Sequence, residues 1–415
     1  MPRNFYLLLV VQFLSTIADN AFLIVAIARV IELAAPDWSI PLLKLCFTMF
    51  YVFLAPFVGQ FSDTLPKGRV MLLANLLKLV AVFLMLAGLD PIIAIGIAGL
   101  GAAKFAPAKY GLITETLPAH ALVRANGYFE GVTVCAVITG TALGGLLVSP
   151  LMSKIQLHLP GLPLGFWPFD TAATSLTLGM LSLLLLNGMA TLLSLYITDS
   201  GARYPTHSFH PVLLCRKFFA ENRLLWRDSL GGLSMLVTTL LWGVGATLQL
   251  IVLRWANESL GLTLAQAAYL QGITAIGVIA GAVLASRHVT LVNVPALLPL
   301  GIVLGLLIPM MLAVSTVFQA AILLIVVGAV AGFFVVPMNA LLQHRGSTLL
   351  TAGRSIAVQG FNENAGMLLM LGVYAAATAV DLPLQVLIWS FSVLITLSMS
   401  LILLMQIRSR TLSNA

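Results

Sequence analysis

Apolar stretches of about 20 residues recur along the whole chain, separated by short segments that contain Pro, Gly and charged residues. A helix of that length crosses the hydrocarbon core of a bilayer and satisfies its own backbone hydrogen bonds there. The pattern therefore predicts twelve membrane-spanning helices, over residues 5–33, 41–61, 70–88, 92–113, 124–149, 171–197, 229–256, 264–285, 294–315, 319–342, 353–379 and 384–407. The short links 89–91 and 380–383 predict antiparallel neighbours.

The composition agrees with a chain that is solvated by lipid. Of 415 residues, 60% are hydrophobic and only 8% are charged, whereas soluble domains carry about 25% charged residues. The first apolar stretch is too long for the core of a signal peptide and contains Asp19, so a retained helix is favoured.

The placement of the basic residues predicts the orientation. One set of loops holds Arg3, Lys67, Arg69, Arg124, Arg203, Arg216, Lys217, Arg223, Arg227, Arg287, Arg345, Arg354, Arg408 and Arg410. The opposite loops hold only Lys154. By the positive-inside rule both termini are cytoplasmic, and the net charge of +7 reports topology rather than binding of nucleic acid.

The longest polar segment divides the predicted helices six and six. We expect an N-terminal half over 1–197, a cytoplasmic linker over 198–228 and a C-terminal half over 229–415. Within the linker, PVLLCRKFFAENRLLWRD predicts an amphipathic helix on the membrane surface, with a plain tether as the alternative. PAKYGLITE from Pro107 and PMNALLQHR from Pro337 share a pattern, as expected if the halves are a parallel duplication.

Motifs typical of metal sites, nucleotide-binding loops and acyltransferases are missing from the sequence. The three cysteines, Cys46, Cys135 and Cys215, lie far apart, and the six histidines form no HExxH. No GxxxxGK loop and no HxxxxD acyltransferase motif occurs. We therefore expect neither a metal site, a cofactor nor an enzymatic activity, although an integral-membrane lipid enzyme remains a competing class.

The loop after the second predicted helix reads GQFSDTLPKGR, residues 59–69. It resembles the signature loop of the major facilitator superfamily, in which Gly59, Asp63, Gly68 and Arg69 hold the matching places. The resemblance implies that Gly59 permits close helix approach and that Asp63 and Arg69 form charge pairs of a cytoplasmic gate. Alternatively, the charges of this loop only set topology. The fold class expected is an all-α integral membrane protein of twelve helices in two six-helix halves.

Longer blocks narrow the resemblance: QFLSTIADNA, APAKYG, RANGYFE, GFFVVPMNALLQHRG and AVQGFNENAGMLLMLGVY look like the bacterial lysophospholipid transporter family. The resemblance implies inward movement of 2-acyl-glycerophosphoethanolamine across the bacterial inner membrane. It also implies a separate cytoplasmic acyltransferase that restores the second chain. The sequence departs from the family pattern at Gln249, where relatives carry a basic residue. Arg254 lies about 140° further around that helix and cannot substitute.

Polar side chains gather on single faces of the predicted helices. The sets with helical spacing are Gln12, Ser15, Thr16 and Asp19; Asn126, Glu130 and Thr133; and Ser355, Gln359, Asn362 and Glu363, while Lys104 and Lys109 flank Pro107. A central charge costs about 2.5–3.5 kcal/mol to insert, so we expect these groups to face the bundle interior. A purely structural role, in which Asp19 neutralises a lysine, is the alternative.

The mixed signs of these groups suit a lysophosphatidylethanolamine head group. We expect Lys104 and Lys109 to bind its phosphate and Asp19, or secondly Glu363, to bind its ammonium. Asn20, Gln249, Asn339 and Asn362 are expected to bond the glycerol and ester oxygens, and Glu130 completes the substrate-binding set.

Charge also bears on the driving force. An anionic lysolipid that enters a negative cytosol is opposed by about 2.3 kcal/mol per charge per 100 mV. Coupling to Na⁺ would offset that cost, with Asp19 or Glu363 as the ion ligand. The runner-up function is a proton- or sodium-coupled transporter of a soluble solute or drug, built on the same fold.

Overall fold

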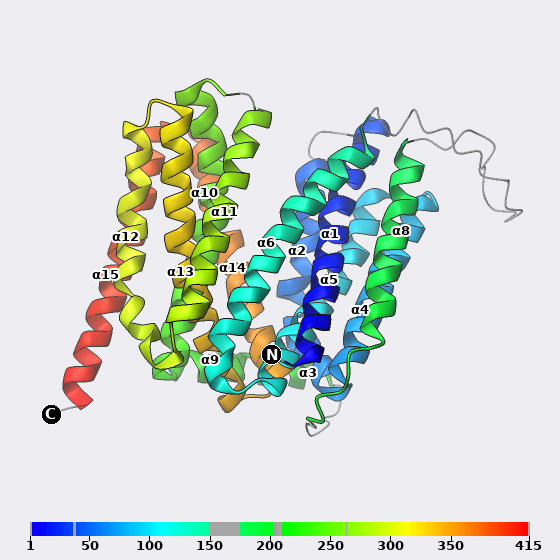
Figure 1. Cartoon of the computed structure of the whole chain (residues 1–415), viewed down its shortest axis with the longest axis horizontal. Helices are drawn as coiled ribbons and strands as arrows, with labels where there is room; N and C mark the ends of the chain where they lie inside the picture. Colours follow the sequence, from blue (N-terminus) through cyan, green and yellow to red (C-terminus); the bar gives the residue numbers. More distant parts are fainter. Residues whose placement is uncertain are drawn as a thin grey trace, which may run out of the picture. The chain divides into compact units, whose positions relative to one another are not determined.

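A computed structural model describes residues 2–35, 39–149, 175–202, 204, 210–262 and 264–413. The described chain is helical: α1 Arg3–Glu32, α2 Ser39–Phe53, α3 Ala55–Thr64, α4 Lys67–Leu86, α5 Pro91–Thr116, α6 Leu122–Leu147, α8 Ser175–Ser194, α9 Pro211–Arg227, α10 Ser229–Leu260, α11 Leu264–His288, α12 Pro299–Leu307, α13 Val317–Leu349, α14 Ala352–Ala379 and α15 Leu384–Ser413. Short 3₁₀ segments precede α6 and flank α12 (Figure 1).

Each predicted span coincides with a helix or with a bent helical pair. Two spans are broken: α2 and α3 meet at 66°, and the 3₁₀ segment Leu291–Leu297 meets the following helix at 44°. Proline explains both breaks, because Pro56 opens α3 and Pro299 opens α12, and neither can donate a backbone hydrogen bond to the preceding turn. In the described part of the chain, nine helices are long and apolar enough to cross a membrane, or up to eleven if each bent pair is one span.

Some sequence expectations fall on residues outside the described part. These are Lys154, Arg203 and the first residues, 171–174, of the sixth predicted span. The amphipathic helix predicted in the linker is present as α9.

The chain forms two compact units. Unit 1 comprises residues 1–115, 135–218 and 351–357, and unit 2 comprises residues 116–134, 219–350 and 358–415. The units follow the two sequence halves except that each takes a short segment from the other half. The start of α14 therefore belongs with the N-terminal helices, and the start of α6 belongs with the C-terminal ones.

The core of unit 1 forms where α8 packs against α1 and α4 (Figure 1). Phe22, Val25 and Leu183 are buried there. Glycines of α6 let α1 approach closely, since a Cβ at Gly140 would lie 2.7 Å from the carbonyl oxygen of Ile17. Small residues at such contacts are typical of helix packing in membranes, where dispersion rather than water exclusion drives association.

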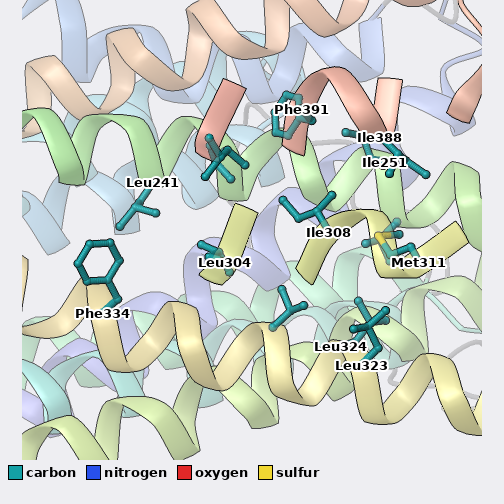
Figure 2. Packing of buried hydrophobic residues seen from close by; sticks show 14 of the residues in the cluster. Leu241, Ile251, Leu304, Ile308, Met311, Leu323, Leu324, Phe334, Ile388 and Phe391 are labelled. Atoms are coloured by element: carbon teal, nitrogen blue, oxygen red, sulfur yellow. The ribbon is translucent and has the colours of Figure 1, made fainter. Parts of the chain in front are cut away.

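The core of unit 2 is an apolar cluster drawn from α10, α12, α13 and α15 (Figure 2). Leu241, Ile308, Leu324, Phe334 and Ile388 are each almost completely buried in it. Asp228 caps α10 by accepting a hydrogen bond from the Gly231 amide at 2.8 Å. Hydrogen bonds from the Arg345 guanidinium, at 2.5 and 2.9 Å, hold the pKa of Asp228 below its ordinary value and fix the cap to α13.

Helices α11 and α13 approach backbone to backbone through glycines on both sides. A Cβ at Gly281 would overlap the Ala329 carbonyl oxygen, and one at Gly328 would overlap the Thr274 carbonyl oxygen. Glycine is therefore required by space at these positions, not by backbone conformation.

We predict that Gly281→Ala destabilises the protein by about 1–3 kcal/mol, because the added methyl overpacks this contact. Gly272→Ala, in the same helix, is the matched control, since a Cβ there meets nothing within 4 Å. It should be neutral or stabilise by up to about 1 kcal/mol, the helical advantage of Ala over Gly. Thermal unfolding of the purified variants in detergent measures both, and equal melting temperatures would contradict the prediction.

Candidate functional site

Asp19 of α1 forms an ion pair with Lys78 of α4. The Asp19 Oδ2 to Lys78 Nζ distance is 2.5 Å, and the lysine side chain is only 3% exposed. A lysine this deep in an apolar bundle requires a partner, because an unpaired buried charge costs several kcal/mol. The structure thus shows the pairing that the sequence left open as the structural role of Asp19.

Neutral side chains extend the ion pair across three helices. Lys78 Nζ also donates to the Ser15 hydroxyl at 2.9 Å, and that hydroxyl donates to Asn75 Oδ1 at 2.8 Å. Asn75 Nδ2 in turn donates to the Ser194 hydroxyl of α8 at 3.1 Å. The polar stripe predicted on α1 is therefore confirmed as an inward-facing one, since Ser15 and Gln12 are buried.

Lys109 of α5 adds a second positive charge to the same region. Its Nζ donates to Gln12 Oε1 of α1 at 3.2 Å and lies 4.8 Å from the centroid of the Tyr110 ring. Lys109 also interacts electrostatically with Asp19. Asp19, Lys78 and Lys109 thus bring two lysines and one carboxylate together in unit 1.

Two other predicted residues do not join this cluster through the contacts that the structure shows. Lys104 Nζ lies 5.3 Å from the centroid of the Phe61 ring. The Asn20 amide donates to its own helix, to the Thr16 carbonyl oxygen at 2.8 Å.

Glu363 of α14 is the centre of a second polar cluster, in unit 2. Gln359 Nε2 donates to Glu363 Oε1 at 2.8 Å and reaches Asn339 Oδ1 of α13 at 3.3 Å. Glu130 of α6 interacts electrostatically with Glu363. The cluster thus combines two carboxyl groups with amide neighbours, a composition different from that of the unit 1 cluster.

Asn362 follows the same face of α14 but bonds to the linker helix. It accepts a hydrogen bond from Trp226 Nε1 at 3.0 Å and donates to Asn222 Oδ1 at 2.9 Å. Its hydrogen-bonding capacity in the structure is thus used to hold α9 against α14.

Gln249 of α10 lies at an apolar cavity of about 280 Å³ in unit 2. Its side chain donates to Gln271 Oε1 of α11 at 2.9 Å, and Gln271 Nε2 donates back to the Gln249 carbonyl oxygen at 2.9 Å. Most of the wall is aliphatic and includes Leu241, Leu304 and Leu324 (Figure 2). Arg254 forms an ion pair with Glu258, in which Nε lies 2.5 Å from Oε1.

Asp63 of the signature loop binds the first turn of α14. It accepts hydrogen bonds from the Thr351 hydroxyl and from the Gly353 amide, the latter at 2.9 Å. A carboxylate at a helix N-terminus is stabilised by the unpaired amides and by the helix dipole. Gly59 makes this contact possible, because a Cβ there would lie 2.9 Å from the Arg354 Cα.

Lys67 continues the same network on the other side of Asp63. Its Nζ lies 2.7 Å from Asp63 and 3.3 Å from Glu115 of α5. Glu115 also accepts hydrogen bonds from Ser200 at 2.5 Å and Tyr204 at 3.0 Å, both in the linker. Burial and the neighbouring Glu115 carboxylate raise the pKa of the Tyr204 phenol, which therefore stays a neutral donor at physiological pH.

The other residues that the sequence predicted for a gate have different surroundings. Gly68 packs against the Ile197 carbonyl oxygen, 2.7 Å from the position of an added Cβ. Arg69 is exposed and forms no ion pair among the described residues. The second cation at Asp63 is Arg354, with an Nε to Oδ2 distance of 3.9 Å.

Sequence reasoning missed Lys78, Lys67, Glu115 and Gln271. A signal existed for Lys78, the single charge inside the apolar run VMLLANLLKLVAVFLML, because an ionisable residue inside a membrane helix marks a functional or paired position. Gln271 carried no such signal, since neutral amides are common at helix contacts.

Comparison with solved structures agrees with this architecture. The human organic anion transporter MFSD10 matches with a TM-score of 0.71 at 14% identity, covering 97% of this chain and 100% of that one. The *Escherichia coli* fucose:proton symporter FucP matches with a TM-score of 0.71, 14% identity and coverage of 96% and 97%. These likenesses show the fold alone. The family model described as Major Facilitator Superfamily matches residues 8–370, so the fold and the signature loop define a multi-pass membrane protein of that class.

Sequence relatives narrow the family further. The lysophospholipid transporter LplT of *Pectobacterium carotovorum* is 37% identical over 376 residues, which cover 90% of this chain and 86% of that protein. The LplT of *Serratia proteamaculans* is 36% identical, with coverage of 92% and 90%. The chain belongs to the lysophospholipid transporter family, as its sequence blocks predicted.

We predict that Lys78→Met destabilises the protein by about 3–5 kcal/mol, because it leaves the Asp19 carboxylate unpaired in the bundle. The double variant Asp19→Asn/Lys78→Met removes both charges and should recover most of that loss. Melting temperatures of the purified variants in detergent test this prediction. A double variant no more stable than Lys78→Met would contradict it, because the lost stability would then not come from an unpaired Asp19 carboxylate.

Proposed function

We propose that this chain transports lysophospholipids, notably 2-acyl-glycerophosphoethanolamine, inward across the bacterial inner membrane, where a cytoplasmic acyltransferase restores the second chain. The observation that carries the proposal is the identity of 36–37% with transporters named for this substrate class, over about nine-tenths of the chain. Each unit supports it by itself: unit 1 holds the buried cluster of Asp19, Lys78 and Lys109, and unit 2 holds the Glu363 cluster and an apolar cavity.

The unit 1 cluster supplies the groups for the phosphate. Lys78 forms an ion pair with Asp19, and Lys109, which lies in the same region, is our candidate for contact with a ligand anion. Its contact with Gln12 is with a neutral group, which a phosphate oxygen can replace. Lys104 is a secondary candidate because it stacks on an aromatic ring instead.

Within unit 2, Glu363 is the candidate for contact with a cationic group of a ligand, whereas the sequence placed Asp19 first. One carboxylate oxygen of Asp19 is paired with the Lys78 ammonium, whereas the donors at Glu363, Gln359 and Thr238 among them, are neutral. Glu130 reinforces the negative potential at Glu363. Asn339 lies beside them and can bond an ester or glycerol oxygen.

The acyl chain is assigned to the cavity beside Gln249. Its volume of about 280 Å³ is close to the lower end of the range of about 300–1,000 Å³ for small-molecule pockets. The aliphatic walls suit a hydrocarbon chain, and the Gln249–Gln271 pair offers neutral hydrogen-bonding groups at its edge. The bonds from Asp63 to α14 would break and reform as the transporter alternates its access.

The decisive assay is translocation of lysophosphatidylethanolamine into proteoliposomes. Glu363→Gln and Lys109→Ala should each lower the initial rate about tenfold or more, because a hydrogen bond to a charged group contributes about 1.5–3 kcal/mol. Matched controls are Asp381→Asn and Lys44→Ala, which alter exposed residues. Full transport by both site variants would leave the polar stripes with a structural role only, and preferential uptake of sugars or cationic drugs would favour a soluble substrate.

We further propose sodium symport with Glu363 as the ion ligand, because Asp19 is neutralised by Lys78. An inward Na⁺ gradient should raise uptake of an anionic lysolipid such as lysophosphatidylglycerol, whose entry the membrane potential opposes. Glu363→Gln should abolish that response. Uptake that is unchanged when a sodium ionophore collapses the gradient would remove the proposal.

A further inference from the structure

Three arginines form a stripe along α9, the linker helix Pro211–Arg227. Arg216, Arg223 and Arg227 are seven and four residues apart, so they share one face of the helix. All three are exposed, and none forms an ion pair with another described residue. The opposite face, with Leu214, Phe218 and Leu225, is buried. The stripe is therefore an outward, uncompensated positive surface.

Apolar side chains flank the arginine stripe on both sides. Val212, Phe219 and Trp226 recur every seven residues on one flank, and the first two are 72% and 55% exposed. Leu213 and Leu224 are exposed on the other flank. Large apolar side chains repeated along an exposed face mark a surface that meets an apolar phase or a partner.

The position of α9 next to a membrane-spanning helix indicates that its exposed face meets the lipid bilayer. α9 ends at Arg227, and α10, a helix apolar enough to span a membrane, begins at Ser229. With one residue between them, α9 lies at the depth where lipid head groups meet acyl chains. An arginine stripe there faces phosphates, and its flanks reach the acyl boundary.

We propose that this face of α9 binds anionic phospholipids of the leaflet on which it lies. An acidic protein would match the arginines but not the exposed flanks, and a zwitterionic lipid would match the flanks but carries no net charge to balance the stripe. The proposed ligand is a structural lipid of the bilayer and is distinct from the transported substrate.

Lipid binding at α9 is linked to the transport helix α14. Trp226, on a flank of the stripe, donates to Asn362, and Asn362 donates to Asn222 one turn earlier on α9. Asn362 adjoins Glu363 in the sequence. Phe219 also meets Phe361 edge-on, with ring centroids 6.1 Å apart. Anionic lipid that holds α9 at the surface therefore holds this part of α14, and should alter the transport rate.

Native mass spectrometry of the full chain from nanodiscs tests the binding. Wild type should retain phosphatidylglycerol in preference to phosphatidylcholine. Arg223→Gln/Arg227→Gln should weaken retention about 30-fold, since each basic residue at an anionic surface is worth about fivefold. Arg3→Gln/Arg287→Gln, which removes the same charge from two exposed arginines outside α9, should weaken retention severalfold less than the α9 variant does. Equal retention by both double variants, or no preference in wild type, would overturn the proposal.

A second readout tests the link to α14 and is separate from the proposed function. In proteoliposomes, wild-type lysolipid transport should differ severalfold between membranes with and without phosphatidylglycerol. Trp226→Phe keeps the ring but removes the donor to Asn362, so it should retain the lipid and lose that difference. If both Trp226→Phe and the arginine variant keep the difference in transport rate, the link is refuted. Retention of lipid by a wild type that moves no lysolipid would refute only the transport function.

Discussion

The Asp19–Lys78 ion pair is the interaction on which the arrangement of unit 1 depends. A lysine that is 3% exposed within an apolar bundle is tolerable only with a carboxylate at hydrogen-bond distance. The pair ties α1 to α4, and the chain of hydroxyl and amide groups through Ser15 and Asn75 carries the connection to α8. Helix α5 brings a second lysine, Lys109, to the same region, where it donates a hydrogen bond to Gln12 of α1.

At the signature loop, too, a buried carboxylate is held by a cation and by the amides of a helix end. Asp63 binds the amide of Gly353, and Lys67 balances its charge from the other side. Because the beginning of α14 belongs to unit 1 while the rest of that helix belongs to unit 2, one helix carries both the gate contact and the Glu363 cluster.

The sequence predicts the helices well, because a span of apolar residues has few alternatives in a membrane. The predicted ranges match helices even where proline bends them, as at Pro56 and Pro299. The signature loop predicts the role of Gly59 and the place of Asp63. Partners are harder to predict: the charges that meet Asp63 are Lys67 and Arg354, not Arg69, since contacts between distant helices depend on their rotation and depth. The same reason explains why Lys78 was not anticipated as the partner of Asp19.

The amide pair of Gln249 and Gln271 has a consequence for how unit 2 responds to its surroundings. Neither side chain carries a charge or titrates over any biological pH range. Their reciprocal hydrogen bonds at the cavity edge are therefore indifferent to acidification and to salt, and the transmembrane electric field does no net work on them when the helices move. A basic residue in that place would carry a charge on which the membrane potential acts, whereas this neutral pair carries none.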